Sequence, residues 1–137
     1  MSEDPSPEAV VSAFIQAMNG WELGAWDALR RARDTPDPAS YWPEIKASFD
    51  LVFAEFCTPR DRPYGGNAAF LHPPEYDPNV EKIIRSEMAG DKAYVDTQRD
   101  GPLGGGARRY TLHRRKGRWL IDSVKRLCGD GWVRVIL

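Results

Sequence analysis

The chain has 137 residues, of which 42% are hydrophobic and 28% charged, and its formal net charge is −1. This length suits one domain with a substantial core, and the composition excludes a largely disordered chain. The near-zero net charge creates no global field that would attract nucleic acid or an anionic membrane. We therefore expect one folded domain over residues 1–137, with neither of these as its partner.

The sequence predicts neither a targeting segment nor a cofactor site. Residues 1–8 are acidic and contain proline, unlike a signal peptide, and no apolar run approaches membrane-spanning length. Cys57 and Cys128 lie far apart without metal-ligand spacing, which favours two small core residues and leaves a disulfide between them open. Two histidines, His72 and His113, are too few for a dedicated zinc site. We expect a cytoplasmic protein with no cofactor.

The N-terminal third of the chain predicts two helices in succession. Ser6-Pro7-Glu8 is typical of a helix start, because a hydroxyl caps the first amides and proline is tolerated in the first turn. Asn19-Gly20 predicts an interruption, after which a second helix continues with the same apolar period. The two apolar stripes are Val11, Phe14, Ile15 and Met18, then Trp21, Ala25, Leu29 and Ala32.

A third helix is predicted after a loop at residues 34–40. Ser40 is its expected cap, and Pro43 lies in its first turn. Thr58-Pro59 predicts its end, because the residue before a proline avoids the helical conformation. Its apolar stripe, the strongest in the chain, consists of Ile45, Phe49, Val52, Phe53 and Phe56.

From residue 80 onward the pattern alternates and predicts antiparallel strands joined by short turns, at residues 80–88, 92–98, 108–116, 118–125 and 132–137. Tyr110 and Leu112 share one face of a hairpin whose second arm presents Trp119 and Ile121, with a turn at Lys116-Gly117. Such an apolar face needs a cover. We therefore predict an α+β fold, a cone-shaped curved antiparallel sheet packed on about three N-terminal helices.

This order of elements, with a late hairpin that reads Tyr110-x-Leu112 and then Gly117-x-Trp119-x-Ile121-Asp122, resembles the nuclear transport factor 2-like cone fold. Within that superfamily the chain resembles the small immunity proteins encoded beside bacterial polymorphic toxins, including those paired with Rhs-type toxins. The resemblance implies a non-catalytic protein that binds and neutralises one cognate toxin domain. It also rests on Met18-Asn19-Gly20-Trp21-Glu22, Phe53-x-x-Phe56-Cys57-Thr58 and Pro73-Pro74-Glu75-Tyr76.

The same fold hosts enzymes, so the alternative is an isomerase, dehydratase or hydrolase, or a ligand binder, that uses the cone pocket. An enzyme needs a general base that projects into an apolar pocket beside a polar partner. Strand parity places His113 and Asp122 on the polar face instead, unless a β-bulge inverts it. A third possibility is a subunit that assembles through its sheet into a homodimer. The groups weighed for catalysis are Asp50, Tyr94, Asp96, Tyr110, His113 and Asp122.

Three features are candidates for contact with a toxin. The segment 61–77 combines aromatic rings with carboxylates, as recognition surfaces do, although a lid on the cone has the same composition. Trp26 falls off its helix stripe, and the arginines around Arg115 complement an acidic partner if they are more than a solvated hairpin. The candidate partner-binding residues are Trp26, Asp61, Tyr64, Glu75, Tyr76, Asp77, His113 and Arg115.

Overall fold

Helices precede strands in the computed structural model, which describes residues 5–59, 76–100, 106–128 and 131–134. The helical elements are α1 (Pro7–Ala32), the short 3-10 helix η1 (Pro38–Tyr41) and α2 (Trp42–Phe56). The strands are β1 (Glu81–Ala89), β2 (Lys92–Arg99), β3 (Gly106–Arg115), β4 (Arg118–Cys128) and β5 (Gly131–Arg134). The predicted α+β class is confirmed, with two α-helices in the described residues in place of the expected three.

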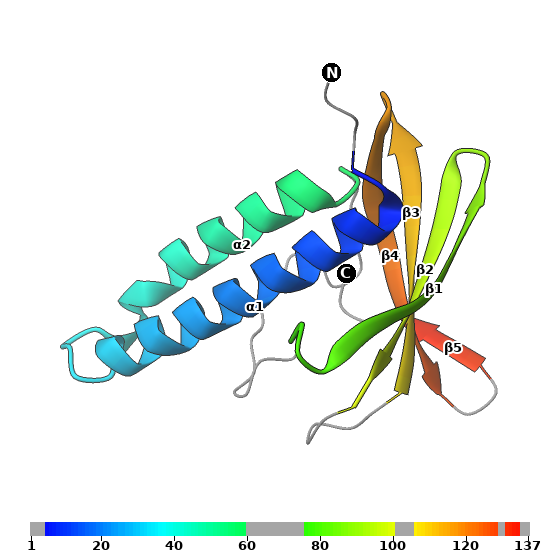
Figure 1. Cartoon of the computed structure of the whole chain (residues 1–137). Coiled ribbons are helices and arrows are strands. Elements are labelled where there is room, and N and C mark those ends of the chain that lie inside the picture. Colours follow the sequence, from blue (N-terminus) through cyan, green and yellow to red (C-terminus); the bar gives the residue numbers. More distant parts are fainter. Residues whose placement is uncertain (1–4, 60–75, 101–105, 129–130, 135–137) are drawn as a thin grey trace.

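The five described strands form one antiparallel sheet in the order β1-β2-β3-β4-β5, so each strand pairs with the next along the chain. Figure 1 shows both α-helices on the same side of this sheet. Between β3 and β4, Lys116 and Gly117 have φ values of 51° and 79°. Two successive left-handed residues match the twist of a tight hairpin, as expected for this turn.

Alternation along the strands divides the sheet into two faces. The inner face, which packs on the helices, carries Val95, Tyr110, Leu112, Ile121 and Val124, all with exposed fractions of 0%. The outer face carries the residues between them, including Tyr94, Asp96, Arg109, His113 and Lys125. The predicted parity, with Tyr110 and Leu112 on the inner face beside Trp119 and Ile121, is confirmed.

Helix α1 runs without interruption through Asn19-Gly20, where the sequence predicted a break. Glycine inside a helix costs about 1 kcal/mol relative to alanine, so contacts elsewhere must offset this cost. Trp21, in the next turn, is buried and its Nε1 donates a hydrogen bond to the carbonyl of Ile45 on α2 at 3.2 Å. Asn19 donates from Nδ2 to the carbonyl of Tyr76 at 2.9 Å. Tertiary contacts therefore outweigh the local turn preference.

The helix ends follow the sequence signals in part. Ser6 caps α1, and its hydroxyl accepts a hydrogen bond from a first-turn amide at 3.2 Å. The predicted cap of α2 at Ser40 is wrong, because η1 leads directly into α2 and Tyr41 takes the cap position without a side-chain hydrogen bond. The backbone of a capping residue is typically extended, whereas the backbone of Tyr41 is helical because η1 continues into α2. The end of α2 is as expected from Thr58-Pro59, with Cys57 extended.

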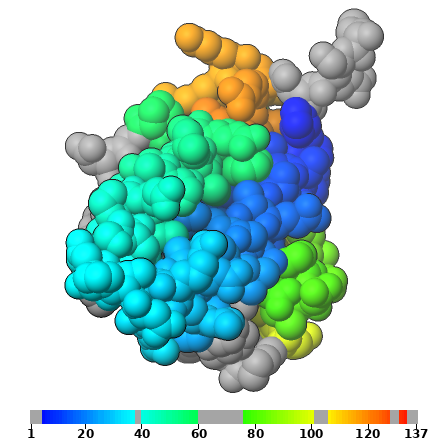
Figure 2. Space-filling model, turned by 90° about the vertical axis from the view of Figure 1, so that its left-hand side faces the viewer, coloured from blue at the N-terminus to red at the C-terminus, as the bar shows by residue number. Residues whose placement is uncertain are grey.

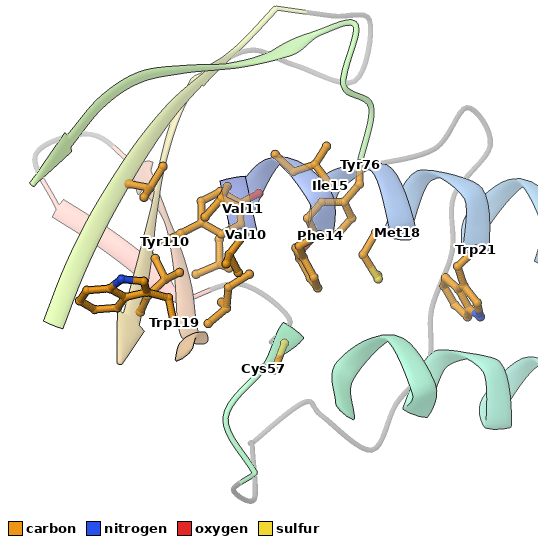
Figure 3. Close-up of a cluster of buried hydrophobic side chains, with 14 of the residues drawn as sticks. Val10, Val11, Phe14, Ile15, Met18, Trp21, Cys57, Tyr76, Tyr110 and Trp119 are labelled. Carbon is orange, nitrogen blue, oxygen red and sulfur yellow. The ribbon is translucent and has the colours of Figure 1, made fainter. Parts of the chain in front are cut away.

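Phe14 on α1 lies at the centre of the core. Its side chain is fully buried, and its ring packs edge-to-face on Phe53, Phe56, Tyr76 and Tyr110, with centroids 5.4 to 6.4 Å apart. Figure 3 shows side chains of α1 directed at those of the sheet. Figure 2 shows α1 and α2 side by side on the helical side of the molecule. One helix thus joins the second helix and the sheet in a single core.

Candidate functional site

A carboxylate is buried on the inner face where β1 begins. The side chain of Glu81 has an exposed fraction of 0%, and its Oε2 accepts hydrogen bonds from the hydroxyls of Tyr110 and Thr97, both at 2.7 Å. Its Oε1 lies 3.5 Å from Nε of Arg99 on the neighbouring strand. These four residues form the inner polar cluster. A buried charge is tolerated when an opposite charge and hydrogen-bond donors surround it, as they do here.

A β-bulge brings Glu81 to the inner face. The pairing of β1 with β2 shifts between Ile83 and Arg85, which places Glu81 opposite Arg99. Without this shift, the register at the hairpin turn puts Glu81 opposite Asp100 and on the outer face. No glycine marks the bulge in the sequence. The sequence therefore carries no local signal that Glu81 is a buried site residue.

Tyr110 remains protonated in this environment. Its complete burial, together with the negative charge of Glu81, raises the pKa of the Tyr110 phenol well above its usual value of 10.0. A neutral phenol keeps the proton that it donates to Glu81. The inner polar cluster is therefore a hydrogen-bonded network at neutral pH, with the hydroxyl groups as donors and the carboxylate as acceptor.

Tyr76 belongs to the core, although the sequence analysis placed it on a recognition surface. Its exposed fraction is 4%, its ring packs on Phe14, and its backbone amide donates to the buried Glu22 at 2.9 Å. Asp77 is half-buried, and its Oδ1 accepts from the amide of Asn79 at 2.8 Å in the turn that precedes β1. Both residues thus position the start of the sheet against α1.

An arginine, a carboxylate and two aromatic rings meet on the outer face. Arg109 makes a two-point contact with Asp96, from Nε to Oδ1 at 2.8 Å and from Nη2 to Oδ2 at 3.1 Å. This hydrogen bond and the charge of Asp96 raise the pKa of Arg109, against a smaller opposing effect of burial. The guanidinium also lies 4.7 Å from the ring centre of Trp132 on β5. A surface hollow of about 140 Å³ adjoins it, lined by Arg85, Glu87, Tyr94, Asp96 and Arg109.

Thr58, Asp122 and His113 form a second polar group beside β4. The Thr58 hydroxyl donates to Oδ1 of Asp122 at 2.8 Å, and Nε2 of His113 lies 3.9 Å from Oδ2 of the same carboxylate. A catalytic triad needs histidine between the acid and the nucleophile, whereas here the acid contacts the hydroxyl directly. Together with the backbone bond from Thr58 to the carbonyl of Ile121 at 2.9 Å, this geometry attaches the end of α2 to the sheet.

The other predicted site residues are distributed over the molecule. Trp26 is half-buried on α1, and Arg115 is exposed at the end of β3. Asp50 lies on α2 in an exposed ion pair with Lys46, away from the inner face. Asp61, Tyr64 and Glu75 lie outside the described residues. The partner-binding role of Trp26, Arg115, Asp61, Tyr64 and Glu75 stays a prediction.

The described part of the chain holds neither a metal-binding cluster nor a membrane-spanning helix. No group of three or more His, Cys, Asp or Glu side chains there is arranged to hold a metal ion. No helix in the described residues is both long enough and apolar enough to cross a bilayer.

Two helices on one side of a five-stranded antiparallel sheet define a small α+β protein among the described residues. The family model described as "NTF2 fold immunity protein" matches residues 6–135, so the chain belongs to this family and is an immunity protein. The chain is similar to "Immunity protein RhsIA" of Dickeya dadantii (strain 3937), with 30% identity over 138 aligned positions, and the match covers 98% of each protein. No solved structure matches the chain significantly.

Proposed function

We propose that this protein neutralises an Rhs-type toxin in the cytoplasm, by direct and non-catalytic binding of the toxin domain encoded beside its own gene. The observation that carries the proposal is the similarity to RhsIA along nearly the whole chain, within a family of immunity proteins. The unit that we propose to bind the toxin is the single domain predicted over residues 1–137. Inhibition follows from occlusion of the toxin's active site or from holding the toxin in an inactive shape.

The inner face supports a binding role over catalysis. An enzyme of this fold requires an inward-facing carboxylate with a polar partner, and Glu81 meets that description. Its Oε2, however, accepts hydrogen bonds from two protein hydroxyls, and its Oε1 lies 3.5 Å from Arg99 Nε without a hydrogen bond. A general base must also reach its substrate, and the Glu81 side chain is fully buried. We therefore assign Glu81 to the stability of the sheet and place toxin contact on another surface.

Co-expression tests the proposal directly. Cells that express the neighbouring toxin domain are expected to survive when this protein is also expressed, and an unrelated toxin domain provides the specificity control. A catalytically inactive variant of the same toxin domain is expected to co-purify with this protein. Cell death despite co-expression, or failure to co-purify, contradicts the proposal.

Titration separates stoichiometric binding from enzymatic inactivation of the toxin. If the protein acts by binding, residual toxin activity falls in proportion to added protein and reaches its minimum at equimolar ratio. If the protein acts as an enzyme, a small fraction of an equivalent suffices and the loss of activity increases with incubation time. The second outcome refutes the non-catalytic mechanism.

A further inference from the structure

The outer face of the sheet carries an excess of positive charge. Among the described residues, its cationic side chains are Lys82, Arg85, Lys92, Arg109, Arg115 and Lys125, and its acidic side chains are Glu87, Asp96 and Asp122. The whole chain, in contrast, has a formal net charge of −1. Charge is therefore segregated, and the outer face is complementary to an acidic surface.

The centre of this face has the composition of a binding hot spot. Arg109, Tyr94 and Trp132 are the residue types enriched at such positions. The two-point contact with Asp96 and the stacking on Trp132 hold the Arg109 guanidinium in place before any partner arrives. Trp132 still has 36% of its surface exposed. Preorganised groups lose little conformational entropy on binding, which favours tight association.

We propose that the outer face, with its excess of positive charge, binds an acidic surface of the cognate toxin domain. This inference rests on the proposed function and names the surface that performs it. The hollow of about 140 Å³ lies within this face, and both signs of charge line it: Arg85 lies 3.8 Å from Glu87, and Arg109 contacts Asp96. Both α-helices lie on the other side of the sheet (Figure 1).

An acidic protein surface fits this face better than a nucleic acid does. Glu87 and Asp96 lie in the hollow itself, between the cationic residues. A polyphosphate backbone presents uniform negative charge, which these two carboxylates repel, and binding through phosphates alone requires a larger cationic excess. A folded protein, in contrast, places donors and acceptors at separate positions and so pairs with both signs of charge.

Charge reversal on the outer face tests the inference. The probe is the purified, catalytically inactive toxin domain encoded beside this protein's gene, and its dissociation constant is measured by calorimetry. The double variant Arg85→Glu with Lys125→Glu is expected to weaken binding by at least about 100-fold, since like charges then face each other across the interface. The matched control, Arg30→Glu with Arg31→Glu, makes the same change in charge at exposed positions of α1 and is expected to bind within about 3-fold of wild type.

The outcomes distinguish this inference from the proposed function. Failure of the wild-type protein to bind the toxin refutes the proposed function. If the wild type binds the toxin and the two double variants either both bind normally or both weaken equally, the inference is overturned. The proposed function is then intact. Dissociation of a homodimer by the outer-face variant, with toxin binding unchanged, also overturns the inference. Circular dichroism verifies folding, and if the reversal variant fails to fold, Trp132→Ala is expected to weaken binding at least about 10-fold.

Discussion

Two carboxylate–arginine pairs on opposite faces of the same sheet differ in how they are solvated. On the inner face, Glu81 and Arg99 have exposed side-chain fractions of 0% and 10%. On the outer face, Asp96 and Arg109 have fractions of 10% and 34%. The inner carboxylate is also bound by two hydroxyls, whereas the outer arginine stacks on a partly exposed tryptophan.

This difference indicates two separate roles for the same pair of charged groups. A fully buried pair depends on each partner, because removal of one leaves an uncompensated charge away from water. In the outer pair one third of the Arg109 side chain is exposed, so Arg109 regains water when Asp96 is lost and this pair contributes less to stability. We therefore expect inner-face substitutions to affect folding and outer-face substitutions to affect binding.

The largest expected effect is that of Glu81→Ala on stability. Loss of this carboxylate removes the hydrogen bonds to Tyr110 and Thr97 and the charge opposite Arg99. We expect the free energy of unfolding to fall by about 3–5 kcal/mol, measured by urea denaturation. The control is Glu87→Ala on the same strand, which is exposed and is expected to change the value by less than about 0.5 kcal/mol. Equal effects of the two variants would abolish the distinction between the faces.

Tyr110→Phe tests one hydrogen bond of the inner polar cluster. We expect a loss of about 1.5–3 kcal/mol at neutral pH, since the hydroxyl donates to a buried charged group. Tyr94→Phe on the outer face, where the tyrosine is half-buried, is the control and is expected to change stability by less than about 0.5 kcal/mol.

The raised pKa of Tyr110 predicts that the free energy of unfolding depends on pH. The pKa of Tyr110 is raised in the folded state, so above about pH 10 the unfolded chain releases this proton while the folded chain retains it. Above about pH 10, the titration of Tyr110 therefore lowers the free energy of unfolding of the wild type by up to about 1.4 kcal/mol per pH unit. Tyr110→Phe has no phenol at this position, so its stability lacks this decline. The difference between the two proteins is expected to narrow between pH 8 and pH 11 in urea titrations. A constant difference would show that the phenol is not held protonated by its surroundings.

On the outer face, Asp96→Asn is expected to lower the free energy of unfolding by no more than about 1 kcal/mol, because the half-exposed Arg109 is then solvated by water. The loss is also expected to shrink at high ionic strength, since salt screens a partly exposed pair. Urea denaturation at low and high salt measures both effects. A loss as large as that of Glu81→Ala would make this pair structural and weaken its assignment to binding.

The smallest change touches neither face. Gly20 lies inside α1, is exposed, and has open space where a Cβ would be added. Gly20→Ala is expected to stabilise the protein by about 0.5–1 kcal/mol and to leave toxin binding unchanged. Its counterpart is Gly90→Ala, at φ +63° between β1 and β2, which is expected to destabilise the protein by about 1 kcal/mol. Destabilisation by Gly20→Ala would indicate that α1 does bend there.

Several elements were predictable because their signals are local. Alternation of apolar residues located all five strands that the structure describes, and it placed Tyr110, Leu112, Trp119 and Ile121 on one face. The capping serine at residue 6 and the Thr58-Pro59 stop depend on backbone geometry within a few residues, and both were confirmed. The division of Arg108 and Arg109 between the inner and outer faces follows from the same alternation.

Other features depend on contacts between distant segments. The sequence alone determined the class of fold and the parity of the late hairpin, because periodicity sets which side chains share a face. Only the tertiary structure decided that α1 continues through Asn19-Gly20, that Tyr76 is buried and that a bulge turns Glu81 inward. In each case the local sequence disfavours the observed structure or leaves it undecided, and contacts with distant segments of the chain decide it. The free energy gained by burial in those contacts cannot be read from any short window of sequence.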